Sequence, residues 1–171
     1  MADRTRDLVL SAMFIAAGVI LPSFFHALGL GAAFLPMFWP VAVAGFFLPL
    51  PAAILTGFLT PVVSFLITGM PPPPILYRMI VELAMLSASI SLLQRRLGIF
   101  LTVASGLVVS LLAGFGGSLL IAPILGLPPA FYAAATMLRG LPGIAAILFI
   151  VPLITGKLKS NALPGNRHGN T

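Results

Sequence analysis

The chain has 171 residues, of which 60% are hydrophobic and only 7% charged, and its formal net charge is +6. A soluble domain usually carries about 25% charged residues, so this composition excludes a soluble fold and indicates an integral membrane protein with one compact domain. Cysteine is absent, which excludes a disulfide framework and a thiolate metal site; the two histidines, His26 and His168, are too few for the usual zinc or haem ligand sets.

Apolar runs and the residues that interrupt them predict an all-α membrane protein. Crossing a hydrocarbon core of ~30 Å takes about 20 residues. Prolines crowd the second and third runs, where we expect kinks shielded by neighbouring helices. The first run is interpreted as a helix and not as a signal peptide, because no convincing cleavage site follows it. The six predicted transmembrane helices cover 7–27, 34–49, 51–69, 74–94, 97–122 and 130–155. They form a membrane domain over 1–156, and a polar cytoplasmic tail follows over 157–171.

The distribution of basic residues predicts the orientation of these helices. With six crossings, seven of the nine basic residues fall on one side of the membrane, while the connections on the other side contain no Lys or Arg. The positive-inside rule then places both termini in the cytoplasm. Nucleic-acid binding is not expected, because no basic domain is present to carry it. The seven residues are Arg4, Arg6, Arg95, Arg96, Lys157, Lys159 and Arg167.

Apart from Asp7, which begins the first predicted helix, three charged residues lie inside predicted helices. Counted from the outer ends of their helices at ~1.5 Å per residue, Arg78 lies roughly 6 Å deep, Glu82 roughly 12 Å and Arg139 roughly 14 Å. A charge at the centre of a membrane helix costs about 2.5–3.5 kcal/mol in insertion free energy, so the presence of these three charges requires a structural or functional explanation. One interpretation is a structural ion pair that joins two helices. The other is an outward-facing pocket whose spare cation receives a carboxylate, phosphate or carbonyl.

Within the pocket interpretation, Glu82 is expected to orient Arg139, the deepest ligand-facing charge, and Arg78 is expected to remain free for a ligand anion. Tyr77 and Tyr132 fall near the same outer level, where they either stack on a planar ligand or belong to the aromatic belt. If the charges prove structural, the pocket is to be sought among Trp39 and these two tyrosines.

Small residues at helical spacing predict close packing between helices. Gly106, Ser110, Gly114 and Ser118 recur every four residues and form one ridge of the fifth predicted helix, which favours packing inside the protein. Ala12 and Ala16 form a small-xxx-small pair in the first predicted helix. This pair fits either ordinary internal packing or a flat docking surface for a separate membrane protein.

Missing motifs narrow the functional classes. The sequence has no GxxxxGK[ST] phosphate-binding loop, so the chain does not power transport by its own ATP hydrolysis. It has neither HExxH nor GxSxG, so we expect no enzyme activity and no cofactor.

Three segments, together with the Ala12–Ala16 pair, resemble a known family. They are FLPMFWPVAVAG at 34–45, LTGFLTPVVSFLITGMPPPP at 55–74 and GLPGIAAILFIVPLI at 140–154. Over roughly 7–155 the chain resembles the substrate-binding S components of energy-coupling factor (ECF) transporters. The chain departs from the family's usual phrase at Phe38, where that phrase has His.

The resemblance implies a multi-pass protein of a prokaryotic plasma membrane that binds a vitamin or related micronutrient near its outer face. It implies three partner subunits, a transmembrane coupling (T) protein and two cytoplasmic ATP-binding subunits, and a release step in which the S component topples in the bilayer. The helix that carries the small pair contacts the coupling protein in such transporters, which points to Ala12 and Ala16. Family pockets draw on later helices and outer loops, which matches Arg78, Glu82 and Arg139 by location.

Two alternatives remain open from the sequence. The chain is a biotin-type S component acting with a different or reduced partner set, or it is a small membrane scaffold or assembly protein whose ion pair is structural.

Overall fold

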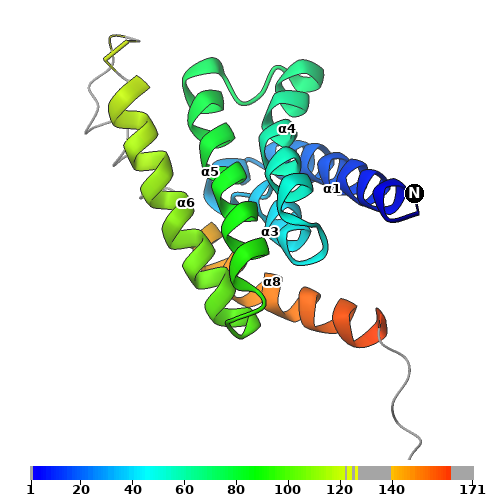
Figure 1. Ribbon diagram of the computed structural model, residues 1–171. Helices are drawn as coiled ribbons and strands as arrows, with labels where there is room; N and C mark the ends of the chain where they lie inside the picture. Colours follow the sequence, from blue (N-terminus) through cyan, green and yellow to red (C-terminus); the bar gives the residue numbers. More distant parts are fainter. Residues whose placement is uncertain (1, 122, 125, 127–139, 163–171) are drawn as a thin grey trace, which may run out of the picture.

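The computed structural model describes residues 2–121, 123–124, 126 and 140–162, and this part of the chain contains helices and no strands. The helices are α1 (Ala2–Ala27), α2 (Gly31–Phe34), α3 (Phe38–Phe47), α4 (Leu50–Thr68), α5 (Pro73–Leu93), α6 (Ile99–Ile121) and α8 (Leu141–Ala162) (Figure 1). Five of them, α1, α4, α5, α6 and α8, are long and apolar enough to cross a membrane. The predicted all-α membrane fold is confirmed.

The second predicted span is shorter than expected. The sequence predicts a helix over 34–49, but α3 covers only Phe38–Phe47 and, at ~1.5 Å per residue, is about 15 Å long. Leu35 takes a left-handed backbone conformation (φ 48°) that separates the single turn of α2 from α3. At the other end Leu48 is extended, and α4 begins directly after Pro49.

The helix ends near 70 follow from glycine and proline. Gly69 ends α4 with φ 72°, a conformation that glycine adopts without strain, and its N–H donates to the Phe65 carbonyl. Pro73 then begins α5, where the N–H that proline lacks would have no partner in the helix. The long proline run therefore separates the end of α4 from the start of α5.

The last helix extends beyond its predicted end. The predicted start at 130 lies outside the described residues, and the described part of α8 begins at Leu141. At the other end α8 continues to Ala162, past the predicted domain boundary at 156. The residues from 163 onward lie outside the described part.

The short helix α3 lies in the middle of the core. Val41 of α3 is fully buried in a cluster with Leu86 of α5, Val103 of α6 and Ile147 of α8. Glycines bring the surrounding helices close, since a side chain at Gly57 of α4 would overlap the Leu83 carbonyl of α5. The core therefore holds α5 firmly between α3, α4 and α6.

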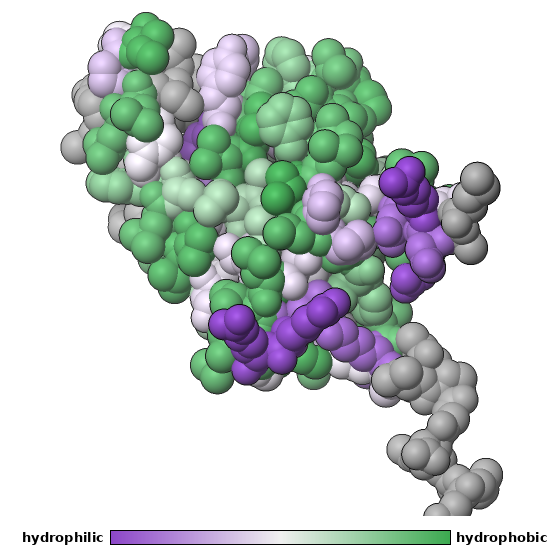
Figure 2. Space-filling model, viewed as in Figure 1, coloured by the Kyte–Doolittle hydropathy of each residue, from purple (hydrophilic) through white to green (hydrophobic). Residues whose placement is uncertain are grey.

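The ends of three helices meet around Lys159. Lys159 of α8 donates to Gln94, which follows α5, over 3.2 Å, and its ammonium lies 4.9 Å from the Phe46 ring of α3. Hydrophilic residues gather along the lower and right-hand edges of the face drawn in Figure 2, while most of the remaining surface is apolar. A largely apolar surface of this kind suits contact with lipid.

Candidate ligand-binding cavity

The two charges of α5 form a buried ion pair. Arg78 and Glu82 are one turn apart, and Nε of Arg78 donates to Oε1 of Glu82 over 2.7 Å. Their side chains are only 7% and 6% exposed. The expectation that Arg78 does not pair with Glu82 is therefore wrong. Residues four apart on one helix share a face, and this spacing brings the two side chains into direct contact.

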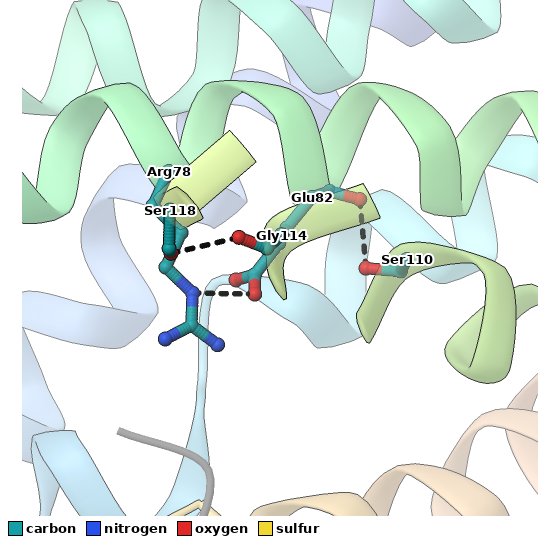
Figure 3. A network of polar contacts seen from close by, with 5 residues as sticks. All are labelled: Arg78, Glu82, Ser110, Gly114 and Ser118. Carbon is teal, nitrogen blue, oxygen red and sulfur yellow. Dashed lines mark hydrogen bonds and ion pairs between the residues drawn. The ribbon is translucent and has the colours of Figure 1, made fainter. Parts of the chain in front are cut away.

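The facing helix α6 is shaped to receive this pair (Figure 3). Ser110 donates from its hydroxyl to the Glu82 backbone carbonyl over 2.8 Å. Gly114 lies against the Glu82 side chain, and a Cβ there would overlap the carboxylate. Ser118 donates to the Gly114 carbonyl over 2.8 Å. The ridge of small residues predicted from the sequence thus packs inside the protein against α5, which confirms the internal-packing interpretation.

A cavity of about 670 Å³ opens beside the ion pair. Its volume lies within the range of small-molecule sites, roughly 300–1,000 Å³. Most of its wall is apolar. The described lining residues are Pro22, Ser23, His26, Gly31, Leu35, Pro36, Met37, Phe38, Ser64, Thr68, Met70, Pro71, Pro72, Ile75, Arg78, Met79, Glu82, Leu111, Gly140 and Ile144.

The segments that carry the family resemblance converge on this cavity. The first contributes Leu35 to Met37, from the connection between α2 and α3, and Phe38, which begins α3. The second contributes Met70 to Pro72, between α4 and α5, and the third contributes Gly140 and Ile144 at the start of α8. Stretches more than 30 residues apart in the sequence therefore build one wall.

Four further polar side chains line the cavity. Ser23 donates to the Val19 carbonyl, Ser64 to the Met70 carbonyl and Thr68 to the Ser64 carbonyl, over 2.8–3.0 Å. Since each hydroxyl donates its proton to the backbone, it can only accept from a ligand, and Thr68 already accepts from the Met70 N–H over 3.2 Å. The fourth, His26, lies at the end of α1 with its ring over Gly31, where a Cβ would overlap it.

Two other predicted ligand residues, Trp39 and Tyr77, lie outside the described lining of the cavity. Trp39 donates from Nε1 to the Phe34 carbonyl over 3.1 Å, and its ring centroid lies 5.5 Å from that of Phe25, so it ties α3 to the preceding turn and to α1. Tyr77 is 45% exposed. Tyr132 and Arg139, with the expected Glu82–Arg139 pairing, lie outside the described residues.

The small pair of α1 lies on an exposed face. Ala12 and Ala16 are both exposed, and they continue an apolar stripe with Leu8, Ile20 and Phe24, which are 62–70% exposed. In Figure 1 the N-terminal end of α1 reaches the right-hand edge of the molecule. None of the described helices buries the pair, so the internal-packing interpretation does not hold for it within this part of the chain.

Sequence reasoning missed His26 and the 70–72 turn as cavity residues. His26 entered only as a possible metal ligand, and within the described residues no three His, Cys, Asp or Glu side chains gather to hold a metal. The turn entered only as the connection between the helices predicted over 51–69 and 74–94. A signal was present, because both the turn and the FLPM phrase were predicted at outer helix ends, where a pocket has its rim.

Comparison with known proteins gives no relative. No protein-family model matches the chain, and searches of curated proteins and of solved structures find no match.

Proposed function

We propose that this chain is the substrate-binding S component of an ECF-type importer in a prokaryotic plasma membrane. It captures a vitamin or related micronutrient in the cavity beside Arg78 and Glu82. The observation that carries the proposal is the convergence of the three family-like segments on one cavity of small-molecule size. A scaffold protein has no need of such a cavity, whereas a binding subunit does.

Location within the bilayer supports the same function. Arg78 and Glu82 lie within the first three turns of α5, which begins at the end opposite to Gln94 and the basic residues that follow it. Intramembrane charges commonly mark a substrate pathway. With the basic end in the cytoplasm, the cavity lies in the outer part of the membrane, where a nutrient arrives.

The exposed face of α1 supports the partner assignment. The chain has no ATP-binding motif, so import requires separate ATP-binding subunits and a coupling protein. Ala12 and Ala16 leave a shallow strip between bulkier apolar residues, and such a strip lets a second helix approach closely. We assign this strip to the transmembrane coupling protein.

Purification from native membranes tests the proposal. An affinity-tagged chain, extracted in mild detergent from the organism that encodes it, should retain a membrane coupling protein and two subunits with phosphate-binding loops, identified by mass spectrometry. Deleting the gene should abolish uptake of one micronutrient. A chain that purifies without any ATP-binding subunit, in cells whose micronutrient uptake is unchanged by the deletion, would contradict the assignment.

One observation favours the second candidate, a scaffold or assembly protein. The ion pair is closed by a direct contact of 2.7 Å and is almost fully buried, as a purely structural pair would be. The two candidates differ in what happens when both charges are removed together, which the closing experiment measures.

A further inference from the structure

A second cavity, of about 550 Å³, lies at the basic end of the helices. Its described lining comes from the stretch between the end of α3 and the first residue of α4, and from the last turn of α5 with two residues that follow it. Figure 1 shows the connection from α5 to α6 at the lower edge of the molecule, where Figure 2 shows strongly hydrophilic side chains. This cavity shares no described lining residue with the cavity beside Arg78 and Glu82.

Side-chain hydrogen bonds join the two halves of its wall. Ser91 donates from its hydroxyl to the Leu48 carbonyl over 3.1 Å. Nε2 of Gln94 donates to the Gly45 carbonyl, also over 3.1 Å. The end of α5 is therefore fastened to the end of α3, and the cavity between them is a fixed feature of the fold.

Two cations belong to this wall. Arg95 lines the cavity and is exposed. Lys159 of α8 contacts two of the lining residues, because its ammonium donates to Oε1 of Gln94 over 3.2 Å and lies 4.9 Å from the centroid of the Phe46 ring. Within the described part of the chain, neither cation forms an ion pair.

The chain supplies no acidic side chain to neutralise these two cations. Its only acids are Asp3, Asp7 and Glu82, so no residue after Glu82 carries a carboxylate side chain, including those that the structure does not describe. Glu82 is paired with Arg78, and the two aspartates of α1 form no ion pair with either cation. The counter-charge for this end of the molecule therefore comes from a binding partner or from the solvent.

The apolar part of the wall continues toward the membrane interior. Leu92 lines the cavity and is 58% exposed. Leu50 also lines it, and Ile54, one turn further along α4, is 41% exposed. An anion with an attached hydrocarbon chain would meet the cations with its headgroup and these side chains with its tail. A free inorganic anion would gain nothing from the apolar side chains.

We propose that this cavity binds the headgroup of an anionic phospholipid, with the phosphate near Arg95 and Lys159 and the acyl chains along Leu92 and Ile54. The positive-inside rule places the basic end in the cytoplasm, so the lipid belongs to the inner leaflet. Basic pockets between helices on this side of a membrane are suited to such headgroups. The inference goes beyond the proposed function, because it assigns a second site for a different ligand.

Native mass spectrometry of the delipidated chain, titrated with a matched pair of lipids, tests the inference. Palmitoyl-oleoyl phosphatidylglycerol and palmitoyl-oleoyl phosphatidylcholine have the same acyl chains, and only the first has a net negative charge. The wild-type chain should bind phosphatidylglycerol with a Kd about tenfold lower than that of phosphatidylcholine. Equal binding, or a preference for phosphatidylcholine, overturns the inference.

Inorganic phosphate distinguishes a lipid from a soluble anion as the occupant. At the same concentration as the lipid it should leave phosphatidylglycerol bound, because it makes no contact with the apolar wall. Displacement of the lipid by phosphate alone would assign the cavity to a soluble phosphate compound and overturn the lipid assignment.

Charge variants separate a defined site from general attraction to a basic surface. Arg95→Gln should weaken phosphatidylglycerol binding about fivefold and leave phosphatidylcholine binding unchanged. Arg4→Gln is the matched control, since it removes the same charge from an exposed residue outside the described lining. Equal losses in the two variants would overturn the site.

Tryptophan variants test the cavity itself. Leu92→Trp places a large side chain at the cavity and should weaken phosphatidylglycerol binding. Leu101→Trp, at a 56% exposed leucine of α6 outside the described lining, should leave binding unchanged. Equal binding by both variants, or equal loss in both, would show that the lipid does not use this cavity.

The lipid titration is independent of the transport assignment, since it needs neither coupling protein nor ATPase. A preference for phosphatidylglycerol in a chain that recruits no ATP-binding subunit would retain the lipid site and reject the transporter. Equal lipid affinities in a chain that does recruit them would retain the transporter and reject the lipid site. A bound phospholipid is recognised by its mass, so it is not counted as cargo of the cavity beside Arg78 and Glu82.

Discussion

Gly114 of α6 lies directly against the Glu82 side chain of α5, so that a Cβ at this position would overlap the carboxylate. The glycine is what allows a buried acid to lie between two closely packed helices. The neighbouring Ser110 then fixes the Glu82 backbone carbonyl. The position of the ion pair is therefore set by a helix that contributes only Leu111 to the described cavity wall.

Gly114→Ala should displace Glu82 and lower the stability of the protein. Overpacking of a close contact costs about 1–3 kcal/mol, and here it also strains the buried ion pair. Gly116→Ala is the matched control, because a Cβ at Gly116 meets nothing within 4 Å. Alanine is the better helix former by up to about 1 kcal/mol, so the control should be neutral or stabilising. Thermal melts in detergent compare the two, and equal midpoints would count against the Gly114 contact.

The packing of α6 was predictable because it depends on local spacing. Residues four apart share a helix face, so Gly106, Ser110, Gly114 and Ser118 had to form one ridge, and a ridge of small residues favours a close neighbour. The stop at Gly69 was equally local. Composition alone was sufficient for the membrane class.

Other features depend on contacts that spacing does not encode. The shortness of α3 follows from a left-handed residue at Leu35, which no rule for leucine anticipates. From the sequence, Glu82 has two candidate partners, Arg78 on the same helix and Arg139 on another. Both lie at a depth close to that of Glu82, so depth does not distinguish them. The cavity itself draws on connections between helices, whose path is set only once α1, α4 and α8 are packed.

Removing one member of the ion pair should destabilise the protein more than removing both. Arg78→Met leaves a buried carboxylate and Glu82→Gln leaves a buried guanidinium, and each should cost about 3–5 kcal/mol. The double variant, Arg78→Met with Glu82→Gln, strands neither charge and should recover most of the loss in thermal melts. Additive losses in the double variant would mean that the two residues do not act as a pair.

Ala12→Trp combined with Ala16→Trp should abolish uptake by the complete transporter while binding of its cargo remains. Two large side chains on the α1 strip block close approach of another helix. Val108→Trp with Leu112→Trp is the control, since these α6 residues are 56% and 66% exposed and also lie one turn apart. Normal transport by the α1 variant, or equal loss in the control, would show that the strip is not the docking surface.

Reporter fusions should find residue 171 in the cytoplasm and the 123–129 connection outside. This expectation rests on the distribution of basic residues. Seven Lys and Arg residues of the connections and tails fall on one predicted side of the membrane, and the connections on the other side contain none. Enzymatic reporters that are active on only one side of the membrane provide the readout at each position. The same sidedness for both fusions would refute the six-helix topology.

Native mass spectrometry of gently purified protein tests the central claim most directly. The wild-type chain from native membranes should carry a small molecule, and so should the Leu112→Trp control. Met79→Trp, with the cavity filled, should lose it. The Arg78→Met, Glu82→Gln double variant should also lose it, although its thermal stability is largely restored. Wild-type protein with no bound molecule, or a bound molecule that survives in both altered cavities, would contradict a cargo site at Arg78 and Glu82 and assign the pair to structure.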